Sequence, residues 1–475
     1  MKRPRKEHER RTTQVGRASA RPAFAHRRGK EGGLKPALLS AWERTLRDLS
    51  DTRAVTETAT GRSCTFRELE AGAAAFGFDA AELAGRAVVF ALPNGIRWLE
   101  LFLALIRASA IAVPLDSAEP AEAQRAAATR LGAAWWEGER LVALPPARRR
   151  RDRELCLVKL TSGTTGAPRP LFFTAAQMLA DARQVTATMG IGRDDVNYAL
   201  IPFGHSYGLG NLTIPLLAQG VPVVCGSIAL PQAIAADFER WGPTVFPTVP
   251  IVWRALAAAE LPPLALASLR LAISAGAPLP PEVARDFVAR FGQSIHAFYG
   301  SSETGGIAFD RTGQQTLAGG VGRALRGVRI KPLRGGRILV ASGAVFTRGN
   351  RRRAGASGAW IPPDGAIVSS RGDITLTGRR GNVVKIAGRR VSLAEVVARL
   401  RATPGIRDAW VGLLPGRDVA LGAVVAAERP AAELRALFQS SVAPWKTPKK
   451  WVVVPELPVT ARGKPNVREL RRLLG

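Results

Sequence analysis

The stretch TSGTTGAPRP, Thr161–Pro170, is a loop of small and hydroxylated residues that ends in a proline-flanked arginine. It follows a hydrophobic run, Leu155–Leu160, that is typical of a buried strand. Small residues let successive backbone N–H groups turn inward and form an anion-binding nest, and Arg169 adds a fixed positive charge. The loop lacks the G-x-x-x-x-G-K-[ST] spacing of a Walker loop. We therefore expect it to bind a polyphosphate, with a solvated Ser/Gly turn as the plainer alternative.

Helix and strand patterns alternate on both sides of this loop. The segment Arg86–Pro93 predicts a strand, Ile96–Ala110 an amphipathic helix and Ile111–Leu115 a second strand. A strand–helix–strand unit of this length indicates a parallel sheet and therefore an α/β fold. Further strands are predicted at Val196–Pro202, Val221–Cys225, Thr244–Val249, Arg270–Ser274 and Ser294–Phe298.

The patterns divide the chain into parts. Residues 1–33 are polar and basic, which predicts a disordered arm. We expect residues 34–380 to form a large domain of parallel-sheet α/β subdomains. Within it, residues 319–380 show only short β-like pieces, which predict a small β-barrel-like subdomain. Residues 382–475 mix a hairpin, strands and helices, so we expect a small mobile α+β lid domain with a hinge near Gly381.

Length and composition restrict the class of protein. With 475 residues and 46% hydrophobic content, the chain is long enough for several globular domains. Cys64, Cys156 and Cys225 are odd in number and far apart, which argues against disulfides and for a reducing, cytoplasmic location. The longest apolar segment, Trp98–Leu115, is interrupted by charged residues, so no membrane span is expected. The net charge of +30 favours anionic ligands, although we do not expect nucleic acid as a specific partner.

Six short segments occur in an order and at intervals that resemble one family of enzymes. They are TSGTTGAPRP at Thr161–Pro170, PFGHSYG at Pro202–Gly208, SAGAP at Ser274–Pro278, YGSSET at Tyr299–Thr304, RGD at Arg371–Asp373 with the following Gly378-Arg379, and PVTARGK at Pro458–Lys464. Together they resemble the adenylate-forming superfamily, which includes acyl-CoA synthetases, peptide-synthetase adenylation domains and luciferases. Arg169 and Gly381 depart from the family pattern, which commonly has Lys at the first position and Asp or Lys at the second.

The resemblance implies an AMP-forming acid–thiol ligase similar to acyl- or aryl-CoA synthetases. In such an enzyme a small carboxylic acid attacks Mg·ATP to give acyl-AMP and pyrophosphate, and a thiol then displaces AMP. The implied ligands are ATP, Mg²⁺ and CoA, with carrier-protein phosphopantetheine as the alternative acceptor. The acyl pocket is expected to include His205, Tyr207, Trp253, Gly276 and Gly300. Few of these side chains are charged, which favours an apolar or aromatic acid.

The same resemblance implies catalytic and metal-binding residues. Lys464 would stabilise the charge that develops between the acid and the α-phosphate. Glu303 would hold Mg²⁺ together with Thr161, because hard cations prefer oxygen ligands. His205 would line the acyl site.

A further set of residues is implied to bind the nucleotide. Tyr299 offers a flat face to adenine, and Asp373 and Arg379 would hydrogen-bond the ribose. The complete set is Thr161, Ser162, Gly163, Thr164, Thr165, Gly166, Arg169, Gly276, Ala277, Tyr299, Gly300, Ser301, Asp373 and Arg379.

Two other functions compete with this interpretation. Gly204–Gly208 reads GHSYG and satisfies the G-x-S-x-G nucleophile elbow, so a serine hydrolase would use Ser206. Its acid would be Asp237 or Asp286, and the one later histidine is His296. The hydrolase leaves most of the six segments unexplained. A non-catalytic nucleotide or nucleic-acid binding protein is the other alternative.

The C-terminal part of the chain is strongly basic. From Arg379 to Gly475 there are 19 Lys and Arg against 7 Asp and Glu, a net charge of +12 from 19 minus 7. Candidates for a basic patch that faces the thiol acceptor are Arg389, Arg390, Lys446, Lys449 and Lys450. Both CoA and acidic carrier proteins suit such a surface, and we expect CoA first.

Overall fold

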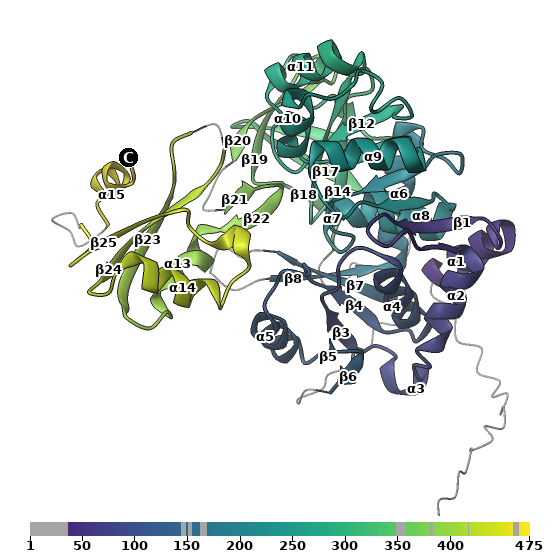
Figure 1. Ribbon diagram of the computed structural model, residues 1–475, viewed down its shortest axis with the longest axis horizontal. Helices are drawn as coiled ribbons and strands as arrows, with labels where there is room; N and C mark the ends of the chain where they lie inside the picture. The colour runs from purple at the N-terminus through teal and green to yellow at the C-terminus, as the bar shows by residue number, and fades with distance from the viewer. Residues whose placement is uncertain are drawn as a thin grey trace, which may run out of the picture. The chain divides into compact units, whose positions relative to one another are not determined.

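Two mixed β-sheets form the framework of the chain (Figure 1). The computed structural model describes residues 37–143, 149–150, 154–161, 169–347, 358–379, 383–416, 418–458 and 465–475. The larger sheet has nine strands, in the order β15 (Arg323–Ala324), β14 (Gly305–Phe309), β13 (Ile295–Ser301), β12 (Leu271–Ser274), β11 (Val245–Thr248), β9 (Asn197–Ala199), β10 (Val223–Cys225), β1 (Arg53–Glu57) and β2 (Ser63–Thr65). Its central strands, from β13 to β1, run parallel, and antiparallel strands close both edges.

The second sheet has six strands and surrounds the loop that opened the sequence analysis. Its order is β6 (Arg140–Val142), β5 (Ala134–Glu137), β3 (Ala87–Phe90), β4 (Ile111–Pro114), β7 (Leu155–Thr161) and β8 (Arg169–Thr174). The strands from β5 to β7 are parallel, and β8 returns antiparallel to β7. Loops after the parallel strands therefore gather at one edge, where ligands bind in folds of this kind.

Helices cover the faces of these sheets. They are α1 (Ala37–Leu49), α2 (Phe66–Ala75), α3 (Ala80–Leu83), α4 (Ile96–Arg107), α5 (Ala121–Leu131), α6 (Ala175–Met189), α7 (Ser206–Gly208), the π-helical turn η1 (Leu209–Thr213), α8 (Ile214–Gln219), α9 (Pro231–Trp241), α10 (Pro250–Ala258), α11 (Pro281–Phe291) and α12 (Gln314–Leu317). Helix α6 begins with a capping box, in which the side chains of Thr174 and Gln177 each accept from the other residue's backbone N–H. In Figure 1, α4 and α5 lie on opposite faces of the six-stranded sheet, because alternate residues of β3 point to opposite sides.

The strands after α12 are shorter and the turns between them rich in glycine. A three-stranded antiparallel sheet contains β16 (Arg329–Leu333), β17 (Arg337–Ser342) and β18 (Gly358–Trp360), and a separate pair contains β19 (Asp364–Val368) and β20 (Ile374–Arg379). Among the described residues these strands form two open sheets and no closed barrel. The predicted loss of helices between 319 and 373 is confirmed over the part of that stretch the structure describes.

The C-terminal residues form a hairpin and a small three-stranded sheet. The hairpin consists of β21 (Val383–Ile386) and β22 (Arg389–Ser392). The sheet contains β23 (Ile406–Leu413), β24 (Leu421–Ala427) and β25 (Lys450–Val454). They are accompanied by α13 (Leu393–Arg401), α14 (Ala431–Gln439), the 3₁₀ turn η3 (Pro444–Lys446) and α15 (Val467–Leu474).

The α/β fold class with parallel sheets that the sequence predicted is confirmed. Each predicted strand and helix exists, with boundaries that shift by a few residues. The domain boundaries stay predictions, and both the basic arm 1–33 and Gly381 lie outside the described residues. Of the helices that the structure describes, none is long and apolar enough to cross a bilayer.

An aromatic cluster ties α4 to the edge of the sheet where the loops gather. Trp98 is 1% exposed, and its ring centroid lies 5.4 Å from that of Phe90, 5.2 Å from Phe102 and 5.4 Å from Phe203. Phe203 belongs to the loop that carries His205, so the core reaches directly under a predicted site segment.

We predict that Trp98→Ala lowers the free energy of unfolding by about 3–5 kcal/mol, because truncation of a buried aromatic leaves a cavity. Urea denaturation followed by circular dichroism measures the change. Leu264, which is 79% exposed, provides the control: Leu264→Ala is expected to change stability by less than about 0.5 kcal/mol. Equal effects of the two substitutions would contradict the assignment of Trp98 to the core.

Candidate active site

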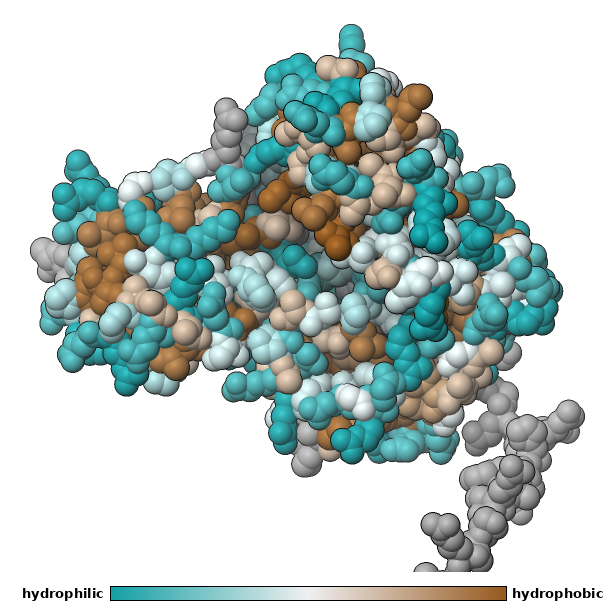
Figure 2. Space-filling view, in the orientation of Figure 1, coloured by the Kyte–Doolittle hydropathy of each residue, from teal (hydrophilic) through white to brown (hydrophobic). Residues whose placement is uncertain are grey.

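A cavity of about 530 Å³ lies where the loops after the parallel strands meet. Its walls come from the ends of β4 and β7, the loop at 200–207, the segment 248–252, Ala275–Gly276, the strands β13 and β14, and the hairpin β21–β22. Segments that are far apart in sequence thus converge on one site. The space-filling view shows hydrophobic residues gathered beside a hollow near the middle of the molecule's face (Figure 2).

The predicted phosphate loop starts at the cavity wall. Thr161 ends β7, is buried and lines the cavity, and its Oγ1 donates to the backbone oxygen of Arg169 at 3.3 Å. Arg169 begins β8, and its guanidinium carbon lies 6.0 Å from the centroid of the Trp360 ring. The residues between them, Ser162, Gly163, Thr164, Thr165 and Gly166 among them, lie outside the described residues.

At Gly276 the backbone lies so close to the backbone of Gly388 that only glycine fits. Gly276 has φ +90°, and a Cβ on it would lie 3.0 Å from the Cα of Gly388 in the turn of the β21–β22 hairpin. It would also lie 3.2 Å from Cγ1 of Val249. Gly276 lines the cavity, and Ala277 beside it is half-buried. A side chain at Gly276 would therefore push the hairpin away from the cavity.

The YGSSET segment contributes cavity wall and core. Gly300 and Ser301 line the cavity, and a Cβ on Gly300 would lie 2.7 Å from the backbone oxygen of Gly305. Tyr299 is 4% exposed, packs in the core, and donates its hydroxyl to Asp364 at 3.0 Å. Asp364 lines the cavity and had not been singled out from the sequence.

The two residues expected at the ribose lie on β20 and just before it. Asp373 accepts from Nε of Arg323 at 2.7 Å, and this hydrogen bond holds the pKa of its carboxyl below the usual value. Asp373 does not belong to the described residues that line the cavity. Arg379 is the last residue of β20, and its backbone stands opposite Asp364 in the ladder with β19.

Glu303 is buried in an ion pair with an arginine of the hairpin. Nη1 of Arg390 donates to Oε2 of Glu303 at 2.9 Å, and Glu303 is 7% exposed. Burial raises the pKa of Glu303, but the charge of Arg390 and its hydrogen bond outweigh it, so the pKa lies below the usual value. Glu303 is therefore an ionised carboxylate, as a metal ligand must be.

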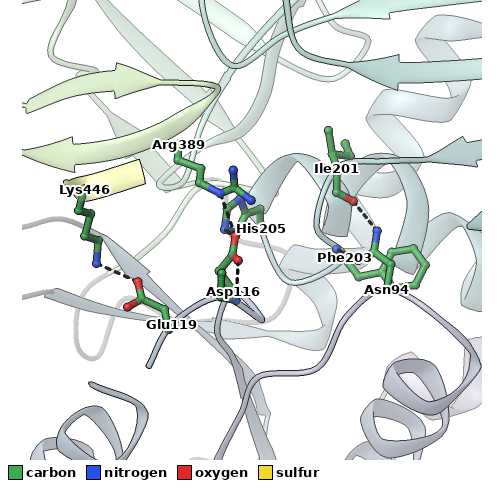
Figure 3. A network of polar contacts seen from close by, with 9 residues as sticks. Asn94, Asp116, Glu119, Ile201, Phe203, His205, Arg389 and Lys446 are labelled. Atoms are coloured by element: carbon green, nitrogen blue, oxygen red, sulfur yellow. Dashed lines mark hydrogen bonds and ion pairs between the residues drawn. The ribbon is translucent and has the colours of Figure 1, made fainter. Parts of the chain in front are cut away.

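A second ion pair joins the same hairpin to the six-stranded sheet (Figure 3). Nε of Arg389 donates to Oδ2 of Asp116 at 2.8 Å, and Nε2 of His205 lies 3.5 Å from that same oxygen. Burial lowers the pKa of His205 below 6.5; Asp116 opposes this shift and Arg389 adds to it. His205 is therefore a neutral imidazole in the cavity wall at pH 7.

The loop that carries His205 is fixed by an asparagine from the turn after β3. Nδ2 of Asn94 donates to the backbone oxygen of Ile201 at 2.8 Å, and its Oδ1 accepts from the N–H of Phe203 at 2.8 Å (Figure 3). One amide side chain thus satisfies two backbone groups of a loop that belongs to the other sheet. In the sequence, Asn94-Gly95 indicates only a turn between a strand and a helix.

Lys446 forms the third connection between the C-terminal residues and the cavity wall. Its Nζ lies 2.8 Å from Oε1 of Glu119 (Figure 3) and 3.2 Å from Oε1 of Glu395. Burial lowers the pKa of Lys446, but the two carboxylates outweigh it and leave the pKa raised. Three members of the predicted acceptor-facing patch, Arg389, Arg390 and Lys446, are therefore neutralised in ion pairs. Whether these residues face the thiol acceptor stays a prediction.

Several charged residues of the cavity wall carry no motif and were missed, among them Asp116, Glu119, Lys159 and Asp181. Asp116 and Glu119 follow the end of β4, a position from which parallel strands commonly supply functional residues. Lys159 lies inside the hydrophobic run before the phosphate loop. A charged residue within a predicted buried strand was the signal that could have identified it. Nothing in the sequence marked Asp181 on α6.

Lys159 and Asp181 are both almost completely buried, at 6% and 2% exposure. Burial lowers the pKa of Lys159, and the nearby Asp181 and Glu303 oppose that shift. Burial raises the pKa of Asp181, and Lys159 opposes that shift. The pocket is thus lined by more charged groups than the sequence indicated. Trp253, which was expected in the pocket, packs in the core and is not one of the described lining residues.

The residues of the alternative hydrolase do not assemble into a triad. Ser206 lines the cavity, but no hydrogen bond joins it to an imidazole within the described part of the chain. Nδ1 of His296 contacts the backbone oxygen of Asp310 at 2.8 Å, on the strand β13. Asp237 accepts from the hydroxyl of Tyr198 at 2.6 Å. His296 and Asp237 are thus engaged elsewhere, and a serine hydrolase is not supported.

Comparison with known proteins agrees with this geometry. The family model described as AMP-binding enzyme matches residues 124–349. Benzoate–CoA ligase of Thauera aromatica is 28% identical over 342 residues, which are 66% of this chain and 65% of that ligase. The chain is therefore similar to the AMP-binding enzymes of the adenylate-forming superfamily.

Solved structures of the superfamily share the whole fold. A double mutant of the o-succinylbenzoate CoA synthetase from Bacillus subtilis superimposes with a TM-score of 0.77 at 19% identity, covering 91% of this chain and 98% of that one. The amide bond synthetase from Marinactinospora thermotolerans gives a TM-score of 0.73 at 25% identity, with 91% and 99% covered. By sequence, the matched region spans less than two thirds of the benzoate ligase.

We predict that the imidazole of His205 titrates below 6.5 and that Arg389→Gln raises its pKa. The substitution removes a nearby positive charge and frees Asp116 to favour the imidazolium. The shift of the imidazole Hε1 proton with pH measures both values, with the signal assigned by its loss in His205→Gln. Because the folded pKa lies below that of the unfolded chain, acidification below pH 6.5 removes stability at this group.

The matched control is Arg401→Gln, since Arg401 pairs with Asp408 on the surface. It is expected to leave the His205 midpoint unchanged. A wild-type midpoint at or above 6.5, or no rise in Arg389→Gln, would contradict the assignment of Arg389 and Asp116 as the groups that set this pKa.

Proposed function

We propose that this chain activates a small carboxylic acid as acyl-AMP and transfers the acyl group to a thiol, first of all that of CoA. The observation that carries the proposal is the cavity at which four of the six sequence segments converge with the hairpin β21–β22. The similarity to the superfamily and the curated CoA ligases among the relatives support it. A phosphopantetheine on a carrier protein remains the second acceptor.

The proposed reaction has two steps. In the first, a carboxylate oxygen attacks the α-phosphorus of ATP, a new O–P bond forms, and the bond to the β-phosphate oxygen breaks to release pyrophosphate. In the second, the thiol sulfur attacks the acyl carbon, a C–S bond forms, the C–O bond to AMP breaks, and the thiol proton passes to solvent. Stabilisation of the charge that develops in the first step is the main task of the site.

We propose that Glu303 and Thr161 hold Mg²⁺ together with oxygens of the nucleotide. Glu303 is ionised and buried, and Thr161 lines the cavity. The described residues contain no group of three or more His, Cys, Asp or Glu that could hold a metal ion, so the phosphates would supply most ligands. When bound, Mg²⁺ neutralises the triphosphate and polarises the reacting phosphoryl group.

Arg390 and a metal ion would compete for the carboxylate of Glu303. In the structure Glu303 is held by Arg390 of the hairpin at 2.9 Å. We therefore assign this arrangement to the second step, after pyrophosphate and its metal have left. The first step would then use Lys464, and the change between steps would occur about the hinge near Gly381. Both residues lie outside the described residues, so these roles rest on the resemblance of their segments.

We propose that the nucleotide occupies the part of the cavity beside Gly276, Gly300 and Ser301. The first two residues have no side chain, so the ligand could approach the backbone closely. Ala277 would flank it. Tyr299 and its partner Asp364 would shape the adenine and ribose side together with Asp373 and Arg379.

A reducing, cytoplasmic location is consistent with Cys64, Cys156 and Cys225, which are buried and unpaired.

ATP–pyrophosphate exchange across a panel of aryl and short-chain acids tests this function. We predict that Lys464→Ala lowers exchange by about 10²–10³-fold, because a charge-stabilising donor is lost. Thioester formation from supplied acyl-AMP is expected to survive. Lys449→Ala, at an exposed lysine, is the control and should exchange normally. No exchange with any acid, together with ester hydrolysis that requires Ser206, would overturn the proposal.

We also predict that Glu303→Gln raises the Mg²⁺ concentration needed for half-maximal exchange, because a neutral amide is a poorer ligand for a hard cation. A magnesium titration of the exchange rate measures it. Glu119→Gln is the matched control, since Glu119 is also a carboxylate in an ion pair of the cavity wall. Its magnesium dependence should equal that of the wild type. The same dependence in Glu303→Gln would remove Glu303 from the metal site.

A further inference from the structure

One end of the cavity carries a buried carboxylate that the proposed reaction does not use. Asp181 lies on α6, lines the cavity and is 2% exposed. The backbone N–H of Gly306 donates to its Oδ1 at 2.9 Å. A carboxylate has room for several donors, so this hydrogen bond leaves much of its accepting capacity unused.

Two glycines make room for this carboxylate. A Cβ on Gly305 would lie 2.2 Å from Oδ1 of Asp181, and a Cβ on Gly210 would lie 2.9 Å from Oδ2. Gly305 has φ +70°, and Gly210 belongs to the π-helical turn η1, a kind of turn that is frequent at functional sites. Side chains at these positions would collide with Asp181, so the backbone is shaped around it.

Two further polar atoms of the cavity wall have no partner within the described part of the chain. Asn211 and Thr248 are each 1% exposed and line the cavity. Nδ2 of Asn211 donates to the backbone oxygen of Tyr207 at 3.1 Å, which fixes the amide. Oδ1 of Asn211 and Oγ1 of Thr248 have no hydrogen-bond partner in the part of the chain that the structure describes. Buried polar groups are normally paired, so these atoms point to a ligand group.

Lys159 and Asp181 have opposite charges, and each favours the ionised form of the other. Lys159 lines the cavity near Asp181, and its Nζ lies 4.4 Å from the centroid of the Phe173 ring. Glu303 is balanced separately by Arg390. Asp181 and Oδ1 of Asn211 accept hydrogen bonds and cannot donate them, so a neutral donor on the ligand would suit them without an additional charge. Val185, Val249 and Phe298 supply apolar wall around the polar atoms.

We propose that the acid activated by this chain carries a neutral hydrogen-bond donor, a hydroxyl or an aryl amino group, at the end remote from its carboxyl group. The donor would bind Asp181, with Asn211 and Thr248 beside it. The acid's own carboxylate would be repelled by Asp181 and would face the phosphate loop. The inference rests on the proposed function and adds a polar group to the apolar or aromatic acid that the sequence favoured.

The experiment compares matched acids in which a methyl group replaces the hydroxyl. ATP–pyrophosphate exchange is measured with 3- and 4-hydroxybenzoate against 3- and 4-methylbenzoate, and with 4-hydroxybutyrate against pentanoate. We expect kcat/KM to be at least tenfold higher for the hydroxyl member of at least one pair. A site built to bind a hydroxyl strongly rejects an analogue without it, because its own polar groups stay unpaired.

Variants assign the preference to these residues. Asp181→Asn keeps an oxygen for the N–H of Gly306 and is expected to reduce the preference at least tenfold, while exchange with the methyl member survives. Thr248→Val has almost the same shape, removes the unpaired hydroxyl, and should reduce the preference even if Asp181→Asn does not fold. Arg183→Gln, at an exposed position of the same helix, is the control and should keep the wild-type preference.

The outcomes separate the inference from the proposed function. Active exchange that favours the methyl member, or neither member, in every pair would overturn the inference and leave the function intact. A hydroxyl preference that Asp181→Asn and Thr248→Val both leave unchanged would also overturn it. Exchange with none of these acids or those of the wider panel would overturn the proposed function itself.

Discussion

The buried ion pairs between the β21–β22 hairpin and the carboxyl ends of the strands are the constraint on which the site depends. Arg389 meets Asp116 and Arg390 meets Glu303, so adjacent residues of one strand connect to both large sheets. Taking such charges out of water is costly, and a well-packed apolar contact would stabilise as much. Breaking one pair leaves a buried charge and costs about 3–5 kcal/mol, so the pairs fix one position of the hairpin.

These pairs also explain how a chain of net charge +30 builds a cavity that is not simply basic. Each arginine or lysine at the cavity wall that contacts the strand ends is matched by a carboxylate, and Lys446 is matched by two. The excess positive charge is therefore carried elsewhere, where it acts as a field that attracts anions over a Debye length. Inside the cavity, burial keeps His205 neutral, whereas the ion pair with Arg390 keeps Glu303 ionised.

Glycines set the second constraint, because they allow backbones to meet where side chains would collide. Gly276 lets the hairpin turn at Gly388 approach the end of β12, and Gly300 packs against the backbone of Gly305. Gly305 and Gly210 leave the space that the carboxylate of Asp181 fills. The same residues that bring the parts of the site together thus also decide the chemistry at its far end.

The sequence by itself determined the fold class, because the alternation of strand and helix periods is local and strong. It also determined the similarity to the superfamily, since residues such as Thr161, Gly276 and Glu303 stand in short segments whose spacing is readable along the chain. Only the tertiary structure decided which charges face one another. Asp116, Lys159, Asp181 and Arg390 lie far apart in sequence and carry no motif, and their burial and pairing arise when two sheets and a hairpin meet at one edge. Electrostatic interactions depend on distance in space and on exclusion of water, and neither is written in the spacing of residues along a chain.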